Sequence, residues 1–235
     1  AKGAKNRPRA SAAPAATRQQ SEDQQILSFL GVAEQAADPK AMQKAIARLK
    51  RMNCFPADAL VTTVTGQKRM DQLAVGDYVL VPSAGGVLKY ERVEMFYHRE
   101  PETRAQFVVL FTESKKRLAM TPLHLLPFGE CSAMRRTLQK TDGVDRLLRA
   151  SRYADSASVG DCVMTVARNG EVAVEKIVKI GRQISAGIYS PMTVDGALVV
   201  DGVLSSCFSQ VESHTVQKVS EFHFHEHLSR GKNHK

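Results

Sequence analysis

The sequence predicts an all-β domain over residues 54–217, built from two halves with the same layout. Three observations support this fold class. Short runs rich in β-branched and aromatic residues recur through the region, as is typical of strands. Glycine-containing turns separate these runs, and parts of the first half repeat in the second. The clearest strands are residues 60–64, 78–81, 107–111 and 197–200, and the clearest turns are residues 65–66, 84–86, 169–170 and 195–196.

The internal repeat indicates a pseudo-twofold relationship between the two halves. The agreement is sustained over roughly twenty positions, which is more than one shared Val-Gly-Asp triplet would give by chance. Because the first half begins at Cys54 and the second ends at Cys207, the duplication places both thiols where the halves converge. The aligned segments are residues 73–79 with 157–163 and 86–93 with 170–177, at an offset of 84, and residues 118–121 with 198–201, at an offset of 80.

Some regions depart from the strand pattern. Polar, Arg-rich residues at 132–153 predict a loop with a helical turn. Residues 1–20 consist mainly of Ala, Arg, Lys, Pro and Gln, which predicts a disordered basic linker. Apolar residues at helical spacing in 21–53 predict short helices at 21–36 and 39–51. A short His-rich tail is expected at 218–235.

Charge and composition narrow the classes of partner. Residues 1–53 carry ten Lys and Arg against four Asp and Glu, so most of the net charge of +9 lies there. This charge fits a basic disordered arm, and the alternative is an arm that binds nucleic acid or a membrane. Aromatic residues make up 6% of the chain and tryptophan is absent, so nucleic acid is not an expected partner. No apolar run approaches the roughly 20 residues that a transmembrane helix needs.

The four cysteines and the His-rich tail leave several interpretations open. An even number of cysteines fits a secreted protein and permits two disulfides without requiring them. Cys131 and Cys162 are expected to be structural thiols or a local disulfide. No Cys or carboxylate framework accompanies the alternating histidines, so a solvated tail is expected and no metal site. These histidines are His214, His223, His225 and His227.

Cys54 and the motif Thr121-Pro122-Leu123-His124 are the residues whose types indicate chemistry. A peptide C–N bond has partial double-bond character, so attack by a thiol is uphill until the nitrogen is protonated and held out of plane. A hydroxyl can hold that amide, and an imidazole with a solution pKa of about 6.5 can donate the proton. A thiol is both a good nucleophile and a good leaving group. This pattern predicts a cysteine that acts on its own upstream peptide bond.

Four motifs resemble the Hint domain of the hedgehog autoprocessing family, in particular the Hog modules of nematode hedgehog-related proteins. They are ordered and spaced as in that family over residues 54–217. The resemblance implies the Hint horseshoe fold and a two-step reaction. Cys54 would attack the carbonyl of Asn53 to give a thioester, and a sterol, another hydroxyl compound or water would then release the N-terminal part. The motifs are Cys54-Phe55-Pro56, the Leu-x-Val-Gly-Asp sequence at 73–77, Thr121–Leu125 and Val203–Phe208.

The resemblance also assigns roles to individual residues. It implies that Cys54, Thr121 and His124 are catalytic and that Asn53–Cys54 is the cleavage site. His98 stands where hedgehogs have an aspartate that activates the sterol hydroxyl, and a histidine can serve as a general base there. Asn53 stands where the family usually has glycine, so its side chain crowds the tetrahedral intermediate. Cys207 matches a family cysteine. Three roles stay open for it: a buried thiol, a redox partner of Cys54 or a direct participant in catalysis.

The family context gives further expectations. The substrate is the domain's own N-terminal segment, the acceptor is a sterol or another lipid or hydroxyl compound, and no resident cofactor is expected. A monomer that enters the secretory pathway, with release of a developmental cell–cell signal, is also expected. The chain does not begin with methionine and has no signal-peptide apolar region, which predicts a processed or excised segment.

Two alternatives compete with self-cleavage. Asn53 and His98 favour an extracellular binding module that keeps the fold without the reaction. An intein-like splicing element would need a carboxy-terminal His-Asn followed by a nucleophile, whereas this chain ends Lys232-Asn233-His234-Lys235.

Overall fold

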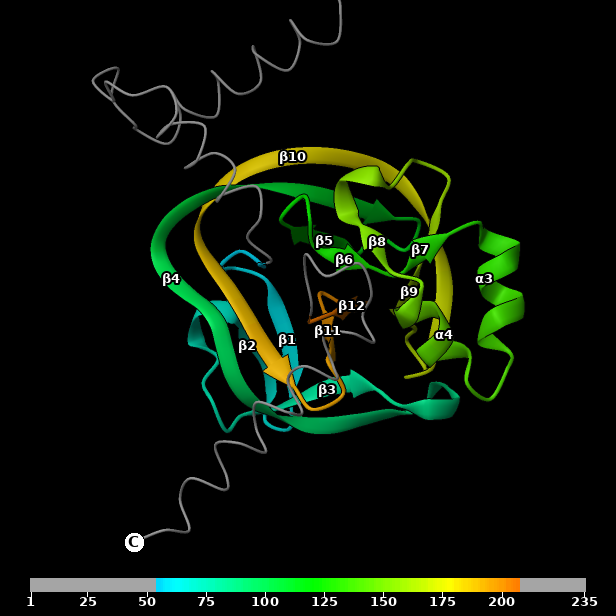
Figure 1. Ribbon diagram of the computed structural model, residues 1–235, viewed down its shortest axis with the longest axis horizontal. Coiled ribbons are helices and arrows are strands. Elements are labelled where there is room, and N and C mark those ends of the chain that lie inside the picture. Colours follow the sequence, from blue (N-terminus) through cyan, green and yellow to red (C-terminus); the bar gives the residue numbers. More distant parts are fainter. Residues whose placement is uncertain (1–53, 208–235) are drawn as a thin grey trace, which may run out of the picture. The chain divides into compact units, whose positions relative to one another are not determined.

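The computed structural model describes residues 54–207, which form a β-rich domain (Figure 1). The all-β fold class is confirmed. The predicted linker, the two predicted helices, Asn53 and the His-rich tail lie outside the described residues. The strands are β1 (Leu60–Thr63), β2 (Gly66–Arg69), β3 (Tyr78–Pro82), β4 (Leu88–Thr112), β5 (Arg117–Met120), β6 (Leu125–Leu126), β7 (Phe128–Gly129), β8 (Arg152–Tyr153), β9 (Cys162–Val166), β10 (Val172–Thr193), β11 (Ala197–Val200) and β12 (Val203–Ser206).

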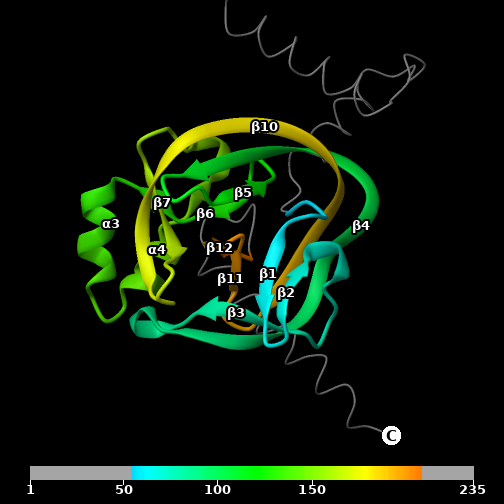
Figure 2. The same cartoon turned by 180° about the vertical axis from the view of Figure 1, so that it is seen from behind.

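Two long antiparallel strands, β4 and β10, run side by side and curve around the outside of the domain (Figures 1 and 2). Register shifts along this pair mark bulges, which bend the strands and increase their twist. The start of β10 pairs with β9 instead of β4. Because the order β10-β4-β3-β1-β11-β12-β9 thus returns to β10, the sheet closes on itself.

The short strands at the centre of the domain carry the core. Every residue of β11 and β12 is buried, because these strands lie between β1 and β9 within the closed sheet. In β1 the side chains alternate, with Val61 and Thr63 buried and the two others partly exposed. This period of two is what a strand with one buried face requires.

The internal repeat of the sequence is also a repeat of hydrogen bonds. The N–H of Gly76 donates to the carbonyl of Val93 at 2.9 Å, and the N–H of Gly160 donates to that of Ile177 at 2.9 Å. Both glycines have positive φ, which a side chain would disfavour. The pseudo-twofold relationship is therefore real at the level of backbone geometry. Two further hydrogen bonds repeat. The N–H of Val93 donates to the carbonyl of Asp77 as that of Ile177 donates to the carbonyl of Asp161. The N–H of Ala74 donates to the carboxylate of Asp77 as that of Ser158 donates to the carboxylate of Asp161.

Two equivalent glutamates interlock the halves. Glu91, on β4 of the first half, accepts a hydrogen bond at 2.9 Å from the N–H of Asp195, in the turn between β10 and β11. Glu175, on β10 of the second half, accepts one at 2.7 Å from Lys116, in the turn between β4 and β5. Each half therefore holds the hairpin turn of the other half in place.

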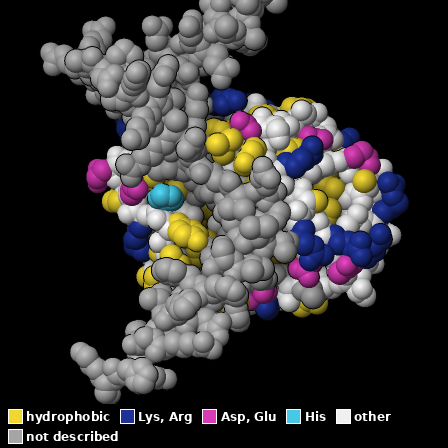
Figure 3. Space-filling view, in the orientation of Figure 1, with side chains coloured by type: hydrophobic (Ala, Val, Ile, Leu, Met, Phe, Trp, Pro, Cys, Tyr) yellow, Lys and Arg dark blue, Asp and Glu magenta, His cyan; other side chains and the backbone are white. Residues whose placement is uncertain are grey.

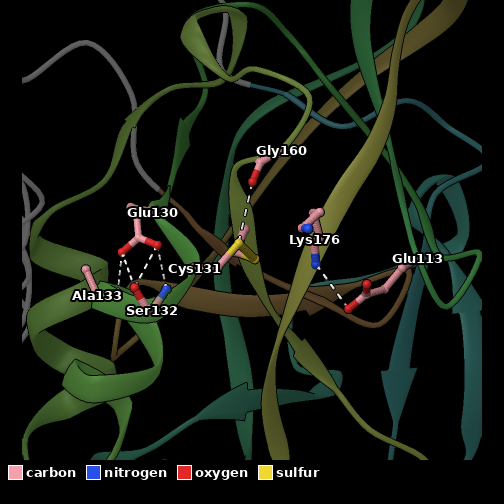
Figure 4. The surroundings of a disulfide bond; sticks show 8 residues. Glu113, Glu130, Cys131, Ser132, Ala133, Gly160 and Lys176 are labelled. Carbon is pink, nitrogen blue, oxygen red and sulfur yellow. Dashed lines mark hydrogen bonds between the residues drawn. A yellow bond between two sulfur atoms is a disulfide. The ribbon is translucent and has the colours of Figure 1, made fainter.

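The prediction of a loop with one helical turn at 132–153 is partly wrong, because the region contains two helices, α3 (Cys131–Leu138) and α4 (Gly143–Arg149). The Glu130 carboxylate accepts hydrogen bonds from the N–H groups of Ser132 and Ala133 and so caps α3 (Figure 4). Helices this short depend on packing rather than propensity. The packing comes from a small cluster that includes Met134, Val144, Leu147 and Leu148.

A disulfide between Cys131 and Cys162 fastens α3 to the sheet, which answers the question that the sequence left open (Figure 4). It joins the first residue of α3 to the first residue of β9. Three short 3-10 turns complete the described elements: η1 (Met70–Gln72), η2 (Ala84–Gly86) and η3 (Ala154–Ser156).

The outward surface of the two helices is basic. Figure 3 shows Lys and Arg side chains gathered over α3 and α4. Within residues 54–207, no helix has the length and apolar character to cross a membrane. The exposed basic residues of this region are Arg135, Arg136, Lys140, Arg146 and Arg149.

Candidate active site

Cys54 and Thr121 are joined by two hydrogen bonds although 67 residues separate them. The N–H of Cys54 donates to Oγ1 of Thr121 at 2.9 Å, and the N–H of Thr121 donates to the carbonyl of Cys54 at 3.0 Å. Both residues are fully buried. The N–H of Cys54 belongs to the predicted scissile peptide, so the hydroxyl contacts the nitrogen that would have to leave.

The Thr121–His124 segment is a tight turn directly after β5. The N–H of His124 donates to the carbonyl of Thr121 at 3.0 Å, and the carbonyl of His124 accepts from the N–H of Ala154 at 2.9 Å. This turn is fixed at both ends, because β5 pairs with β4 before it and the 3-10 turn η3 holds it after. Its geometry explains the spacing of threonine and histidine in the sequence.

The His124 ring is buried and held in one orientation. Its Nε2 lies 2.9 Å from the carbonyl oxygen of Ser206, which can only accept, so Nε2 carries the proton. The neutral ring then has its lone pair on Nδ1, and no group within residues 54–207 makes a hydrogen bond with Nδ1. Burial lowers the pKa of His124 to about 4, and the bond to Ser206 offsets part of this effect. At neutral pH the ring is therefore an uncharged proton acceptor.

Phe55 connects this ring to the cysteine. The Phe55 and His124 ring centroids are 4.4 Å apart, with the planes inclined at 58°. Phe55 follows Cys54 directly, and its backbone exchanges two hydrogen bonds with Tyr189 on β10, at 2.9 and 3.0 Å. The imidazole thus lies against the residue next to Cys54, so the structure brings Cys54, Thr121 and His124 together.

His98 is placed differently from these three residues. It lies on β4 where Tyr97 and His98 together face Ser190 of β10, which is a bulge. Its side chain is 35% exposed, and Nδ1 lies 3.5 Å from Oε1 of Glu100. A bulge commonly redirects a side chain. Among the described residues, the polar partner of His98 is Glu100 and not a member of the buried group.

Cys207 directly follows β12, next to Ser206, whose carbonyl contacts His124. It is a thiol, 2% exposed, and its Sγ lies 3.8 Å from Oγ1 of Thr193. Its N–H donates to the carbonyl of Gly196 at 2.9 Å. Cys54 is likewise a buried thiol and not part of a disulfide. Within residues 54–207, no cluster of His, Cys, Asp and Glu is arranged to hold a metal ion.

Sequence reasoning missed three contributors to this site. Ser206 acts through its backbone carbonyl, Phe55 through ring contact and Thr193 through a hydroxyl. Phe55 and Ser206 belong to motifs around the two cysteines, which was a usable signal. Thr193 gives no such signal, because its position depends on how β10 and β12 meet in space.

The fold and site together define a class: a duplicated all-β domain whose buried cysteine is held by a Thr-x-x-His turn. The Hint module family model matches residues 39–232. The chain belongs to the Hint module family, in its hedgehog-related type.

Relatives and solved structures agree with this assignment. The chain is 60% identical over 169 residues to protein qua-1 of Caenorhabditis elegans, covering 72% of this chain and 14% of that protein. It is 33% identical to warthog protein 1 of the same organism (69% and 30% covered) and 32% identical to sonic hedgehog protein of Danio rerio (69% and 37% covered). The chain therefore spans about a seventh to somewhat more than a third of these relatives. A DnaB mini-intein variant has the same fold, with a TM-score of 0.51 at 10% identity, covering 70% of this chain and 98% of that one.

Proposed function

We propose that this domain cleaves the peptide bond between Asn53 and Cys54 in cis, by an N-to-S acyl shift followed by release of the N-terminal part. The observation that carries the proposal is the pair of hydrogen bonds between Cys54 and Thr121, on the same turn as the buried His124. Membership of the hedgehog-related Hint family supports it. Because nucleophile and target are adjacent in one chain, proximity alone lowers the barrier by several kcal/mol.

The state of His124 determines the order of proton transfers. With a pKa of about 4, the ring carries no spare proton at neutral pH. It must therefore first take the thiol proton of Cys54 on Nδ1. The thiolate then attacks the carbonyl carbon of Asn53, and the imidazolium returns the proton to the Cys54 nitrogen as the C–N bond breaks. The products are a thioester and a free amine, and the ring is neutral again.

Release of the N-terminal part is the second step of the proposal. The oxygen of an acceptor attacks the thioester carbonyl, and Cys54 leaves as a thiolate when the C–S bond breaks. The acceptor is a sterol, another hydroxyl compound or water, and His98 serves as the base that takes the acceptor's proton. A His98→Ala protein would then still form the thioester but lose transfer to its own acceptor. Unchanged transfer in this variant would exclude the role.

The cellular setting follows the same family relationship. We infer that the domain works in the secretory pathway as a monomer, with its own N-terminal segment as substrate, and releases a signalling part. The disulfide between Cys131 and Cys162 supports an oxidising compartment.

The decisive experiment is nucleophile-induced cleavage of the purified chain. Hydroxylamine attacks a thioester but does not reduce a disulfide. It should therefore split the protein between residues 53 and 54 and leave the Cys131–Cys162 disulfide intact. Intact-mass measurement identifies the boundary. Cys54→Ala and His124→Ala proteins should stay whole, and equal cleavage of the Cys54→Ala protein would refute the mechanism.

Dithiothreitol provides a second nucleophile if its side effect is controlled. It would reduce the disulfide as well as cleave the thioester, so the matched protein is the double variant Cys131→Ser, Cys162→Ser. Cleavage by dithiothreitol in both the parent and the double variant would show that it results from attack on the thioester and not from reduction of the Cys131–Cys162 disulfide.

A non-catalytic binding module is the second candidate function, and Asn53 is the observation that favours it. A side chain at the scissile carbonyl crowds the tetrahedral intermediate. If crowding limits the reaction, Asn53→Gly should accelerate cleavage several-fold. If both proteins stay whole with hydroxylamine, the binding module becomes the better description.

A further inference from the structure

Within residues 54–207, the hydrogen bond of the His124 ring is to a single backbone atom at the end of β12. The Ser206 carbonyl, 2.9 Å from Nε2, decides which ring nitrogen carries the proton. Because Ser206 is the last residue of β12, the position of its carbonyl depends on how the next residue, Cys207, is held. The contacts of Cys207 therefore influence the tautomer of His124.

Cys207 is fixed by two hydrogen bonds to the turn that follows β10. Its N–H donates to the carbonyl of Gly196 at 2.9 Å. The hydroxyl of Thr193 donates its one proton to the carbonyl of Ala197 at 2.8 Å. Because that proton is used, the 3.8 Å contact between Thr193 Oγ1 and Cys207 Sγ requires the thiol to be the donor. Cys207 is thus held as a protonated thiol.

Thr193 is itself held from two sides. It is the last residue of β10, 3% exposed, and its carbonyl accepts from the N–H of Gly196 at 3.1 Å, which closes the turn. Glu91 of the other half anchors the same turn through the N–H of Asp195. The support for Ser206 therefore extends from a buried hydroxyl to the interlock between the two halves.

We propose that Thr193 and Cys207 are positioning residues, which fix the Ser206 carbonyl and thereby keep His124 in the Nε2–H tautomer with Nδ1 available to the Cys54 thiol. Cys207 acts through its hydrogen bonds and not as a second nucleophile. The kinetic consequence rests on the proposed self-cleavage, whereas the tautomer can be observed without any cleavage.

The repeat supplies a matched control. Thr112 ends β4 as Thr193 ends β10, it is also 3% exposed, and its hydroxyl lies in a hairpin turn as well. Thr193→Val and Thr112→Val remove one buried hydroxyl each with little change in volume. A general loss of stability should appear in both variants, and a change at His124 only in the first.

The first readout is ¹⁵N NMR of the His124 ring in full-length protein carrying Cys54→Ala, which prevents the proposed cleavage. We expect the Nε2–H tautomer in this background and with Thr112→Val, and a substantial Nδ1–H population with Thr193→Val. Thr193→Ser should restore the single tautomer. An unchanged ring spectrum in Thr193→Val overturns the proposal, whether or not the domain cleaves itself.

The second readout is the rate of hydroxylamine-induced cleavage in proteins that retain Cys54. Because loss of the correct histidine tautomer in a serine protease costs about 10⁴-fold in rate, a partial loss in Thr193→Val should slow cleavage at least about tenfold. Thr193→Ser and Thr112→Val should stay close to the unsubstituted rate. Equal slowing by both valine variants would contradict the proposal. If Thr193→Val does not fold, Cys207→Ala replaces it, and normal tautomer and rate there would contradict the proposal equally.

Discussion

Cys54 and Thr121 bind each other through reciprocal hydrogen bonds, one from the Cys54 N–H to the Thr121 hydroxyl and one from the Thr121 N–H to the Cys54 carbonyl. The repeat contains a second pair of this kind. Asp201, equivalent to Thr121, accepts from the Leu60 N–H at 3.2 Å and donates its own N–H to the Leu60 carbonyl at 2.8 Å. The duplicated fold thus supplies one backbone clamp twice, and the clamp of the first half holds the cysteine.

Thr121→Val should impair both stability and cleavage. The valine leaves the buried N–H of Cys54 without its acceptor, which costs about 1–3 kcal/mol. Cleavage by hydroxylamine should slow about tenfold or more, because the scissile nitrogen is no longer held. Thr121→Ser keeps the hydroxyl and should retain most of the rate. Urea unfolding and timed mass spectrometry measure the two effects, and a normal rate in the valine variant would exclude the positioning role.

His124 should titrate well below the usual range of histidine. Burial lowers its folded pKa to about 4, against about 6.5 for an unperturbed histidine. NMR titration of the ring in the Cys54→Ala protein should therefore show the midpoint near 4, with His124→Gln identifying the signal. A midpoint near 6.5 would contradict a buried neutral ring.

The same shift makes stability depend on pH. The unfolded chain binds a proton at this histidine below about pH 6.5, whereas the folded protein binds it only below about pH 4. The contribution of His124 to the free energy of unfolding is therefore fully present above pH 6.5. It falls by about 3 kcal/mol as the pH drops to 4. Comparison of the parent with His124→Gln in urea unfolding at several pH values isolates this contribution.

The sequence allowed much of this domain to be predicted, because local signals and the fold agree over most of it. The strands at 60–63, 78–82 and 197–200 follow β-branched runs, and Gly66, Gly170 and Gly196 have the positive φ expected of turns. Thr121 and His124 could be grouped because their spacing reflects one turn after β5. These features are local in the chain, whereas Cys54 lies 67 residues before Thr121 and was joined to them by the expected chemistry and the family motifs.

Other features depend on contacts between distant segments and were not predictable. The sequence pattern indicated a short strand at 107–111, whereas β4 continues over 25 residues because β10 pairs along it. A disulfide to Cys162 ties α3 to β9, and the pairing of Cys131 cannot be read from spacing. The contact of Ser206 with His124 spans 82 residues and uses a backbone atom, so the motif around Cys207 marks Ser206 without showing which residue its carbonyl contacts.

Asp201→Asn should stabilise the protein at neutral pH. Burial raises the pKa of Asp201 to about 6 from 3.8, and Oδ2 has no hydrogen-bond partner within residues 54–207. Below pH 3.8 the carboxyl is protonated in both the folded and unfolded states. As pH rises through 6, the folded protein must ionise a poorly hydrated group, so stability falls by about 2 kcal/mol.

Asparagine keeps the acceptor for Leu60 and tolerates the φ of 50° at this position. The expected gain is about 2 kcal/mol at pH 7.5 and close to zero at pH 3.5. Asp145→Asn, on α4, is the control and should have little effect at either pH. A gain of equal size at both pH values would show that charge is not the cause. Between pH 6 and 4, protonation of Asp201 raises the free energy of unfolding while the His124 effect lowers it. Asp201→Asn removes the first effect, so the stability of this variant should fall more steeply with acid than that of the parent.

Gly187→Ala should destabilise the site at the point where β10 passes the chain that follows Cys54. Gly187 has a φ of 85°, and an added Cβ would lie 2.8 Å from Cβ of Ala57 and 2.9 Å from Cε2 of Tyr189. Strain and overlap together should cost about 2–4 kcal/mol. Since Tyr189 pairs with Phe55 and Ala57 lies three residues beyond Cys54, cleavage should slow as well.

Gly181→Ala is the matched control in the same strand, because no atom lies within 4 Å of an added Cβ there and its φ is not positive. It should change stability by less than about 1 kcal/mol and leave the cleavage rate unaltered. Ala57→Gly combined with Gly187→Ala removes the overlap with residue 57 while keeping the strain of a positive φ. Partial recovery of stability and rate in this double variant is expected, whereas no recovery would assign the whole effect to backbone strain and to Tyr189. If Gly187→Ala and Gly181→Ala proved equally mild, the close approach of β10 to the Cys54 segment would not be a determinant of the site.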